Sequence, residues 1–246
     1  GSQGNWSTIM TRHIVLSLSG GMDSATLLAH YLVRVNISAD HIHAVSFSYG
    51  SKHNNYELEA AAKLCAYYEI EDYQRHDLSE IMGGFHSNLM QSGGDIPEGH
   101  YEAKSMSQTV VPGRNLIFAS LLAGLAWSIG GDGGAIVALG IHAGDHAIYP
   151  DCRPEFFYSL GRTVGLATDH QVKMEAPFLE VSKSVILREG LEMGVPYHLT
   201  RTCYKDQPIA CGKCGACQER LEAFIDNTTR DPIDCEFRNV LPKETK

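Results

Sequence analysis

The feature that most constrains the fold is an apolar strand that leads directly into a glycine-containing turn and then a helix. Residues 14–18 are apolar enough for a buried parallel strand, and residues 25–33 place apolar side chains at helical spacing. The turn between them, residues 19–24, has the sequence Ser-Gly-Gly-Met-Asp-Ser. Gly20 and Gly21 lack a Cβ atom, so successive backbone N–H groups can approach an anion closely at the positive end of the helix dipole. The stretch therefore predicts a phosphate-binding turn.

The side chains of this turn indicate a magnesium-bound nucleotide. Ser19 and Ser24 can add hydroxyl donors, whereas Asp23 would repel a bare phosphate unless a divalent cation bridged the two groups. The turn is not a Walker A loop, because Gly-x-x-x-x-Gly-Lys-Ser/Thr is absent. Its Ser-Gly-Gly-x-Asp-Ser order resembles the PP-loop of ATP pyrophosphatases, enzymes that cleave ATP between its α- and β-phosphates. An ordinary glycine-containing strand–helix turn is the alternative.

The length and the charge of the chain favour a soluble enzyme that acts on small molecules. The chain has 246 residues with 43% hydrophobic composition, enough for one large α/β domain with a small appendage. No apolar run approaches the roughly 20 residues that span a bilayer, and no secretory signal precedes the first strand, so we expect a cytoplasmic protein without a membrane partner. A net charge of −9 argues against direct nucleic-acid binding. Residues 1–12 are interpreted as a leader or an expression remnant.

Strand-like and helix-like segments alternate along the chain. The predicted strands are residues 41–49, 73–78, 135–141 and 172–175, and the predicted helices are residues 54–68, 116–129, 155–166, 183–193 and 218–226. This alternation predicts right-handed βαβ units and a doubly wound, mostly parallel sheet that binds ligands at the carboxyl ends of its strands. Residues 48–53 follow one such end, beside the phosphate turn.

The regular pattern stops between residues 79 and 112. Glycine pairs and Pro97 interrupt this segment, which predicts no long element except a short helix near residues 81–90. Long loops inside a compact domain are usually functional or mobile, so we interpret residues 79–112 as a substrate lid. A tolerated surface insertion is the alternative.

Four of the seven cysteines lie within 15 residues of each other, at the spacing of a metal site. They are Cys203, Cys211, Cys214 and Cys217. Four thiolates can close a tetrahedral zinc site without an open position, so we expect structural zinc in a C-terminal region of residues 201–246. A redox relay or an iron–sulfur cluster is the alternative.

Charged residues near the ends of strands and helices are candidate ligand-binding groups. Asp151 could cap the following helix or accept hydrogen bonds from a purine edge. Arg114 and Arg153 could hold a carboxylate or phosphate, or form ordinary salt bridges. Lys183 could neutralise a leaving pyrophosphate or be a solvated lysine, although a cation at a helix N-terminus needs another reason to be there.

Three histidines are candidate acid–base groups: His53, His142 and His146. A structural role is the alternative for each of them.

Several motifs occur together in one order and spacing. They are Ser19-Gly-Gly-Met-Asp-Ser24, Tyr49-Gly-Ser-Lys-His53, Val111-Pro-Gly-Arg-Asn115, Tyr149-Pro-Asp-Cys-Arg153 and the four-cysteine cluster. Between about residues 13 and 235, the chain resembles the QueC family of 7-cyano-7-deazaguanine synthases. The resemblance implies a PP-loop domain of the adenine-nucleotide-hydrolase, Rossmann-like type over residues 13–200, with bound zinc, Mg²⁺, ATP as cosubstrate and a homodimer.

The resemblance also implies the reaction: 7-carboxy-7-deazaguanine, ammonia and ATP give the nitrile used in queuosine-type modification. A carboxylate is a poor electrophile, so ATP must first adenylate it and release pyrophosphate, and an amine then attacks the acyl-adenylate. A second ATP activates the amide for dehydration, so no protein nucleophile is required.

Site residues are assigned on these motifs. The catalytic residues are Asp23, Ser24, Arg114 and Lys183. The ATP-binding residues are Leu18, Ser19, Gly20, Gly21, Met22, Asp23, Ser24, Phe47, Ser48 and Arg114. The substrate-binding residues are Tyr49, His53, Asn115, Asp145, Asp151 and Arg153. Asp23 is assigned to magnesium, and the four clustered cysteines to zinc.

The segment before Tyr149 departs from the family pattern. Family members often have Asn-x-x-Asp-Tyr-Ser-Gly there, whereas this chain has His142, His146, Ala147 and Ile148 at the Asn, Tyr, Ser and Gly positions. Two alternatives therefore stay open: an enzyme that stops at the amide, and one that joins the deazaguanine acid to another amine, such as a protein N-terminus. A zinc-knuckle adaptor that binds a nucleotide is the non-enzymatic alternative.

Overall fold

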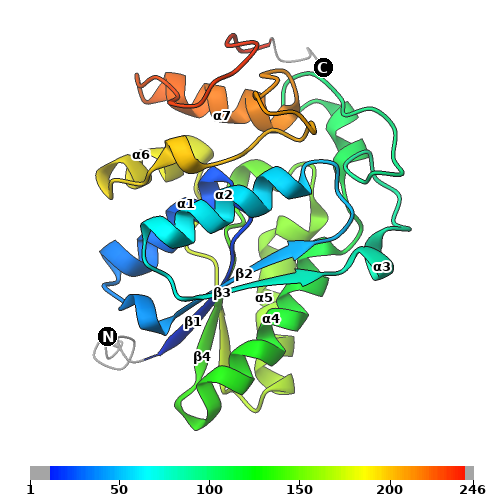
Figure 1. Ribbon diagram of the computed structural model, residues 1–246. Coiled ribbons are helices and arrows are strands. Elements are labelled where there is room, and N and C mark those ends of the chain that lie inside the picture. The colour runs from blue at the N-terminus through cyan, green and yellow to red at the C-terminus, as the bar shows by residue number, and fades with distance from the viewer. Residues whose placement is uncertain (1–11, 242–246) are drawn as a thin grey trace.

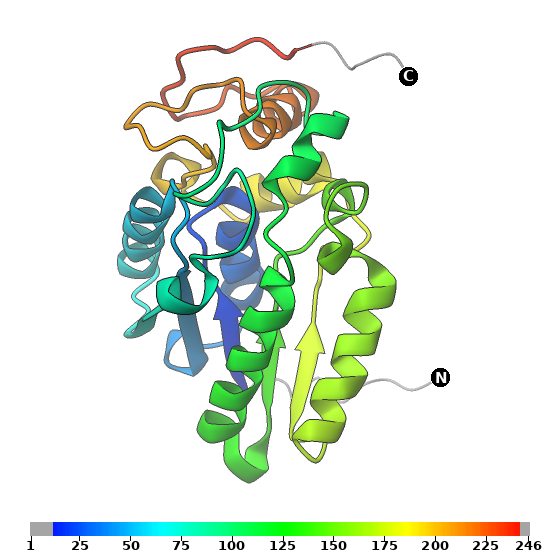
Figure 2. The ribbon, with the colours of Figure 1, turned by 90° about the vertical axis from the view of Figure 1, so that its right-hand side faces the viewer.

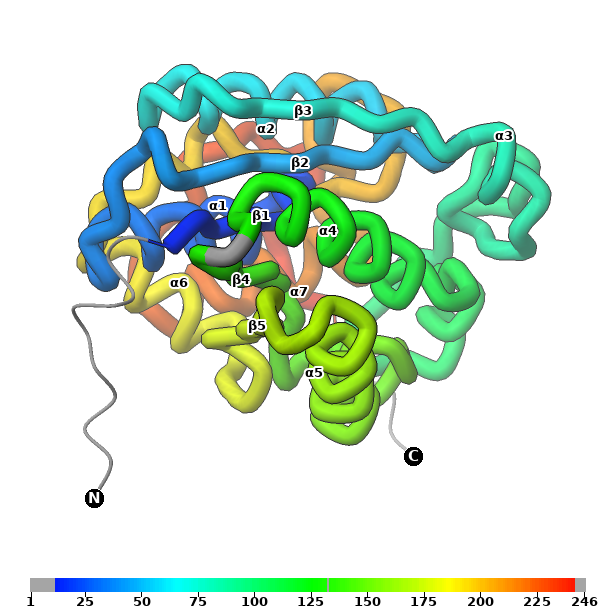
Figure 3. Tube along the Cα trace, turned by 90° about the horizontal axis from the view of Figure 1, so that it is seen from below, coloured from blue at the N-terminus to red at the C-terminus, as the bar shows by residue number. Residues whose placement is uncertain are grey.

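The computed structural model describes residues 12–241, so the predicted leader lies almost entirely outside the described part. Its centre is a five-stranded, all-parallel sheet in the order β3-β2-β1-β4-β5 (Figures 1 and 3). The strands are β1 (His13–Ser17), β2 (Ile42–Ser48), β3 (Asp72–Asp77), β4 (Ala135–Ala138) and β5 (Val172–Glu175). The order reverses at β1, which confirms the predicted doubly wound α/β fold.

Seven α-helices connect and cover these strands in the described part of the chain. They are α1 (Met22–Ala29), α2 (Asn54–Tyr67), α3 (Ser79–Met82), α4 (Arg114–Gly130), α5 (Pro154–Ala167), α6 (Lys183–Glu192) and α7 (Gly215–Asp226). A π-helical turn, His30–Arg34, continues α1. Short 3₁₀ turns lie at Ala39–His41, Lys104–Thr109, Gly131–Gly133, Ala143–Asp145, Pro150–Cys152 and Tyr197–Leu199.

Both faces of the sheet are buried, which is why its inner strands are apolar runs. On one face Val15 packs with α4 and α5, and on the other Ile14 and Leu16 pack with α1, α2, α6 and α7. Side chains of a strand alternate between the two faces of the sheet, so neighbouring residues of β1 pack into two separate hydrophobic cores. The helices therefore form two layers around the sheet (Figure 3).

The last helix and the irregular segment lie together over the carboxyl ends of the strands (Figure 2). A bridge between Glu98 and Cys214, and a hydrogen bond from Gly99 N to Lys213 O (2.9 Å), attach residues 79–112 to the cysteine region. The predicted short helix near residues 81–90 is wrong in position: α3 ends at Met82. No described helix is long and apolar enough to cross a membrane.

The start of α1, the start of α7 and the end of β4 each differ from the prediction by three residues. Helix α1 begins at Met22, because Ala25 N already bonds to Gly21 O (3.0 Å), so the turn supplies the first turn of the helix. Helix α7 likewise begins at Gly215, inside the cysteine cluster. Strand β4 ends at Ala138 rather than residue 141. The two helix starts lie in glycine-containing turns without a helical apolar period, whereas residues 139–141 are mostly apolar but line the cavity.

Candidate active site

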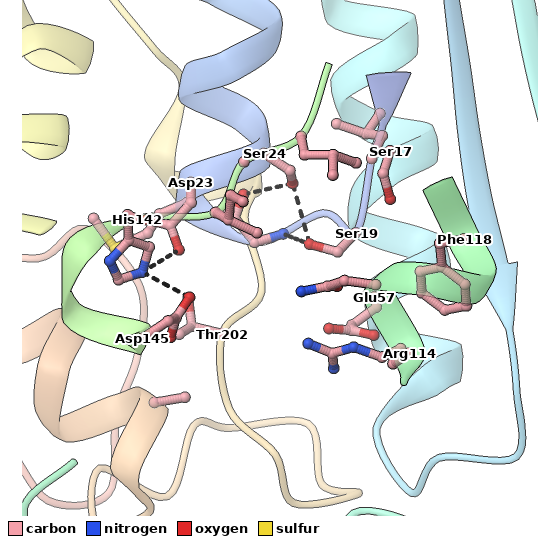
Figure 4. Close-up of a pocket in the computed structure, with 18 of the residues that line it drawn as sticks. Ser17, Ser19, Asp23, Ser24, Glu57, Arg114, Phe118, His142, Asp145 and Thr202 are labelled. Atoms are coloured by element: carbon pink, nitrogen blue, oxygen red, sulfur yellow. Dashed lines mark hydrogen bonds and ion pairs between the residues drawn. The ribbon is translucent and has the colours of Figure 1, made fainter. Parts of the chain in front are cut away.

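The candidate active site is a cavity of about 200 Å³ at the carboxyl ends of β1, β2 and β4 (Figure 4). The turn between β1 and α1 lines it together with residues of α2, α4, α6 and α7. The predicted site residues that line it are Leu18, Ser19, Gly21, Met22, Asp23, Ser24, Phe47, Tyr49, His53, Arg114, Asn115, Asp145 and Lys183. The cavity lies beside the reversal of strand order, where parallel α/β sheets bind ligands.

The phosphate turn is held in one conformation by its own hydrogen bonds. Gly21 N donates to Ser19 Oγ (3.2 Å), and Ser24 Oγ donates to Gly21 O (3.1 Å) and lies 3.2 Å from Ser19 Oγ. Gly20 has φ +80°, and a Cβ there would lie 2.5 Å from Glu57 O. Only glycine therefore fits at residue 20, both in backbone conformation and in space.

Lys183 joins two carboxylates at the inner end of the cavity. This lysine is 7% exposed, and its Nζ lies 3.1 Å from Asp23 Oδ2 and 2.5 Å from Glu219 Oε2. Burial lowers the pKa of Lys183, but the two carboxylates outweigh it and raise the pKa well above its usual range. Burial would raise the pKa of Asp23, yet Lys183 and His142 hold it far below its usual range. The lysine at this helix N-terminus is thus a buried ion-pair partner, not a solvated side chain.

His142 completes this charged cluster. It is 1% exposed, and its Nε2 lies 3.5 Å from Asp23 Oδ2 and 3.4 Å from Asp145 Oδ2 (Figure 4). Burial lowers the pKa of His142, but the surrounding carboxylates raise it to about 9. Its Nδ1 accepts a hydrogen bond from Gly144 N (3.1 Å), which fixes the ring orientation. His142, Asp145 and Glu219 are also close enough together to hold a metal ion.

An aromatic wall and an arginine lie on the opposite side of the cavity (Figure 4). The rings of Phe47 and Phe118 stack with centroids 4.3 Å apart. Arg114 Nη1 lies 3.4 Å from Tyr49 Oη, and within residues 12–241 this guanidinium has no carboxylate within ion-pair distance. This side can therefore stack a flat ring and bind an anionic group.

Four predicted site residues do not line the cavity: Gly20, Ser48, Asp151 and Arg153. The predicted capping of the following helix by Asp151 is wrong, because α5 has no side-chain cap. The carboxylate of Asp151 instead accepts a hydrogen bond from Asn115 N (2.9 Å) in the first turn of α4. Arg153 Nε donates to His146 O (2.9 Å), and neither residue lines the cavity.

Glu219 is the main residue that sequence reasoning missed. It is 8% exposed and reaches Lys183 from α7, far away in the sequence. Its position two residues after Cys217, a little over half a helical turn, gives no local signal that it faces the cavity. Further lining residues that were not predicted include Glu57, Cys152, Thr202 and Tyr204.

The four clustered cysteines form a separate site next to the cavity. All four are buried free thiols, and their sulfur atoms lie within 4.8 Å of one another. Cys203 Sγ accepts from Cys211 N (3.4 Å), and Cys211 Sγ accepts from Cys214 N (3.3 Å). Backbone N–H groups that point at sulfur stabilise thiolates, so the cluster fits a structural metal ion.

Comparison with known proteins supports the motif-based resemblance. A family model described as "Queuosine biosynthesis protein QueC" matches residues 13–228. Relatives include 7-cyano-7-deazaguanine synthase of Alteromonas mediterranea, 45% identical over 227 residues, and 7-cyano-7-deazaguanine synthase 1 of Colwellia psychrerythraea, 44% identical over 227 residues. Each match covers 92% of this chain and 100% of the relative.

Solved structures give a weaker likeness. The glutamine-dependent NAD⁺ synthetase from Acinetobacter baumannii, in complex with adenosine diphosphate, matches with a TM-score of 0.47 and 20% identity. The match covers 80% of this chain and 33% of the synthetase, so this chain spans about a third of that protein's length.

Proposed function

This chain belongs to the QueC family, and from that membership we propose that it is a 7-cyano-7-deazaguanine synthase. The enzyme converts 7-carboxy-7-deazaguanine and ammonia to the nitrile at the expense of ATP. The observation that carries the proposal is the cavity itself, in which a phosphate-binding turn, Asp23 and Lys183 face Arg114 and an aromatic wall.

ATP would bind with its phosphates over the turn at residues 19–24. The backbone N–H groups and the hydroxyls of Ser19 and Ser24 would donate to phosphate oxygens. Asp23 Oδ1 is buried and has no hydrogen-bond partner, which fits a role as a magnesium ligand. Bound magnesium would supply charge neutralisation, and Lys183 would add a fixed positive charge beside the leaving pyrophosphate.

The deazaguanine acid would lie against Phe47 and Phe118. A flat bicyclic ring can stack there, and Arg114 would hold the carboxylate near the α-phosphate of ATP. Tyr49, His53 and Asn115 would complete the substrate contacts. Asp151 would act indirectly, by fixing the first turn of the helix that carries Arg114.

The reaction would proceed through an acyl-adenylate with release of pyrophosphate, and then through an amide with release of AMP. A second ATP would activate the amide oxygen for elimination to the nitrile. Cys152 lines the cavity, but burial raises the pKa of its thiol strongly, which disfavours a thiolate nucleophile. Catalysis would then depend on positioning and electrostatics.

Zinc is the ion that best fits the four-thiolate cluster. In this proposal residues 13–200 form the catalytic domain, residues 201–246 form the zinc region that completes the cavity, and residues 79–112 cover it. A cytoplasmic homodimer is also proposed, and the exposed apolar side chains Leu121 and Trp127 on α4 support it as a surface for a second copy.

Mass spectrometry of a reaction with 7-carboxy-7-deazaguanine, Mg-ATP and ammonium tests the function. We expect the nitrile together with AMP and pyrophosphate. Amide as the final product would favour the alternative that stops halfway, and a conjugate formed only with another amine would favour the second alternative. Absence of any acid-dependent pyrophosphate release would overturn the synthase and support a nucleotide-binding adaptor.

A further inference from the structure

A second, smaller cavity adjoins the active site. Its volume is about 20 Å³, which is room for about one water-sized molecule. It shares Asp145, Tyr149, Tyr204, Ala216 and Glu219 with the main cavity. The rest of its wall is Tyr101, Met106, Gly144, Ile148 and Gly215. The side cavity therefore lies behind the two carboxylates, under the segment that was predicted to be a lid.

The chemistry of this wall favours a small cation that can donate hydrogen bonds. Asp145 and Glu219 stand where the two cavities meet. Glu219 Oε2 is paired with Lys183, and its Oε1 lies 3.9 Å from His142 Nε2, beyond hydrogen-bond distance. This oxygen points along Gly144, where an added Cβ would lie 2.3 Å from it. A carboxylate oxygen in a small cavity is stabilised when a bound ligand donates a hydrogen bond to it.

The remaining wall also suits a cation of this size. Tyr101, Tyr149 and Tyr204 line the cavity, and a tyrosine can offer an ammonium group either its aromatic face or its hydroxyl oxygen. A magnesium ion would demand about six oxygen ligands in a strict geometry, whereas this wall offers two carboxylates and otherwise mostly aromatic, methionine and isoleucine side chains. Ammonium has the volume of water and four N–H donors, so it matches the cavity in size, charge and hydrogen bonding.

We propose that this side cavity is the ammonium site, from which the nitrogen donor reaches the activated carboxyl group; the proposal rests on the synthase function. A bound ammonium would transfer one proton to the Asp145 carboxylate. The resulting ammonia attacks the acyl carbon, a C–N bond forms, and the C–O bond to AMP breaks with its electron pair leaving on AMP. Loss of a second proton from nitrogen gives the neutral amide.

The side cavity also sets an upper limit on the size of the amine. Ile148 forms part of its wall at a position where the family pattern often has glycine. A methyl group on nitrogen would require more than the space of one water molecule, so methylamine should be excluded. The structure thus assigns Ile148 as a specificity-determining residue.

Two substitutions at Ile148 test the site in opposite directions. Ile148→Trp fills the side cavity, and Ile148→Gly enlarges it. Ile81→Trp is the matched control, because Ile81 is 68% exposed on α3 and lines neither cavity. For each protein we would measure acid-dependent exchange of pyrophosphate into ATP, which needs no ammonium, and then the KM for ammonium in nitrile formation.

We expect Ile148→Trp to raise the ammonium KM by about tenfold or more, equivalent to about 1.4 kcal/mol of lost binding, with exchange unchanged. With methylamine, Ile148→Gly should form the N-methylamide while the wild type does not. An unchanged ammonium KM in Ile148→Trp, or rejection of methylamine by Ile148→Gly, overturns the ammonium site. If Ile148→Trp also loses pyrophosphate exchange, its ammonium KM is not informative, and the reaction of Ile148→Gly with methylamine tests the ammonium site instead. Absence of exchange in the wild type would instead refute the synthase function.

Discussion

Replacing Gly20 by alanine tests whether the phosphate turn has the tight geometry described above. The substitution has two separate costs. A left-handed φ of +80° costs an alanine about 1–2 kcal/mol. The new Cβ would also lie 2.8 Å from both Ala60 Cβ and Ala61 N, and relief of such overpacking costs about 1–3 kcal/mol. The free energy of unfolding should therefore fall by about 2–5 kcal/mol.

The assay is thermal and urea unfolding of Gly20→Ala with two control glycines. For a chain of this size the expected loss lowers Tm by about 10 °C. Gly113→Ala isolates the backbone cost, because Gly113 has φ +63° but no atom near its Cβ position, and it should lose about 1–2 kcal/mol. Gly124→Ala, in the open middle of α4, should gain about 0.5–1 kcal/mol.

The comparison between the two left-handed glycines decides the outcome. If Gly20→Ala destabilises the protein no more than Gly113→Ala, the close approach of the turn to α2 is not as described. Gly20→Ala should also weaken ATP binding, because Gly20 O accepts from Arg201 N (2.8 Å) and the displaced turn would no longer present its N–H groups to phosphate.

Three further substitutions probe the charged and metal-binding residues. Asp23→Ala should reduce steady-state pyrophosphate release by about a hundredfold or more with an unchanged circular dichroism spectrum, and activity near wild type would remove Asp23 from the account of catalysis. Cys214→Ser should lower both bound zinc, measured by atomic emission, and Tm; normal zinc content would contradict a four-thiolate site. Arg220→Met breaks a bidentate pair to Asp231 (2.7 and 2.8 Å) in which both side chains are buried, and should cost about 3–5 kcal/mol in urea unfolding; a loss under about 1 kcal/mol would show that the pair is not buried as described.

The sequence predicts the fold well because local signals agree with the tertiary arrangement. The β1 strand and the helix over residues 54–68 have strong apolar patterns, and each lies within a residue or two of its predicted place. The β4 strand was predicted too long, since residues 139–141 are apolar but line the cavity, although Leu139 N still bonds to Glu175 O at the end of β5 (3.0 Å). An apolar sequence pattern indicates that residues are buried. Residues buried beneath a ligand site show the same pattern as residues buried in a sheet, so the pattern alone does not distinguish them.

Long-range partners were the part that sequence could not supply. Lys183 was a candidate on chemistry, but nothing local shows that it pairs with Glu219 on another helix. Asp151 shows the same limit: its position before Pro154 indicates a cap on α5, yet the tertiary fold presents it to α4. When a side chain could accept hydrogen bonds at either of two helix N-termini, tertiary packing determines which one it contacts. The neighbouring sequence does not encode that packing.

The cysteine cluster and the catalytic residues are mechanically connected through α7. This helix begins at Gly215, between two of the clustered cysteines, and carries Glu219 into the cavity less than two turns later. Glu219 forms an ion pair with the Lys183 ammonium group, which also forms an ion pair with Asp23. A metal ion at the cysteines would therefore fix the first turn of α7 and, through it, the positions of two charged side chains that line the cavity, Lys183 and Asp23. Because Glu219 also bounds the side cavity, the same anchored helix would set the distance between the nitrogen donor and the phosphate site. A metal site without an open coordination position can thus matter for the reaction by geometry alone.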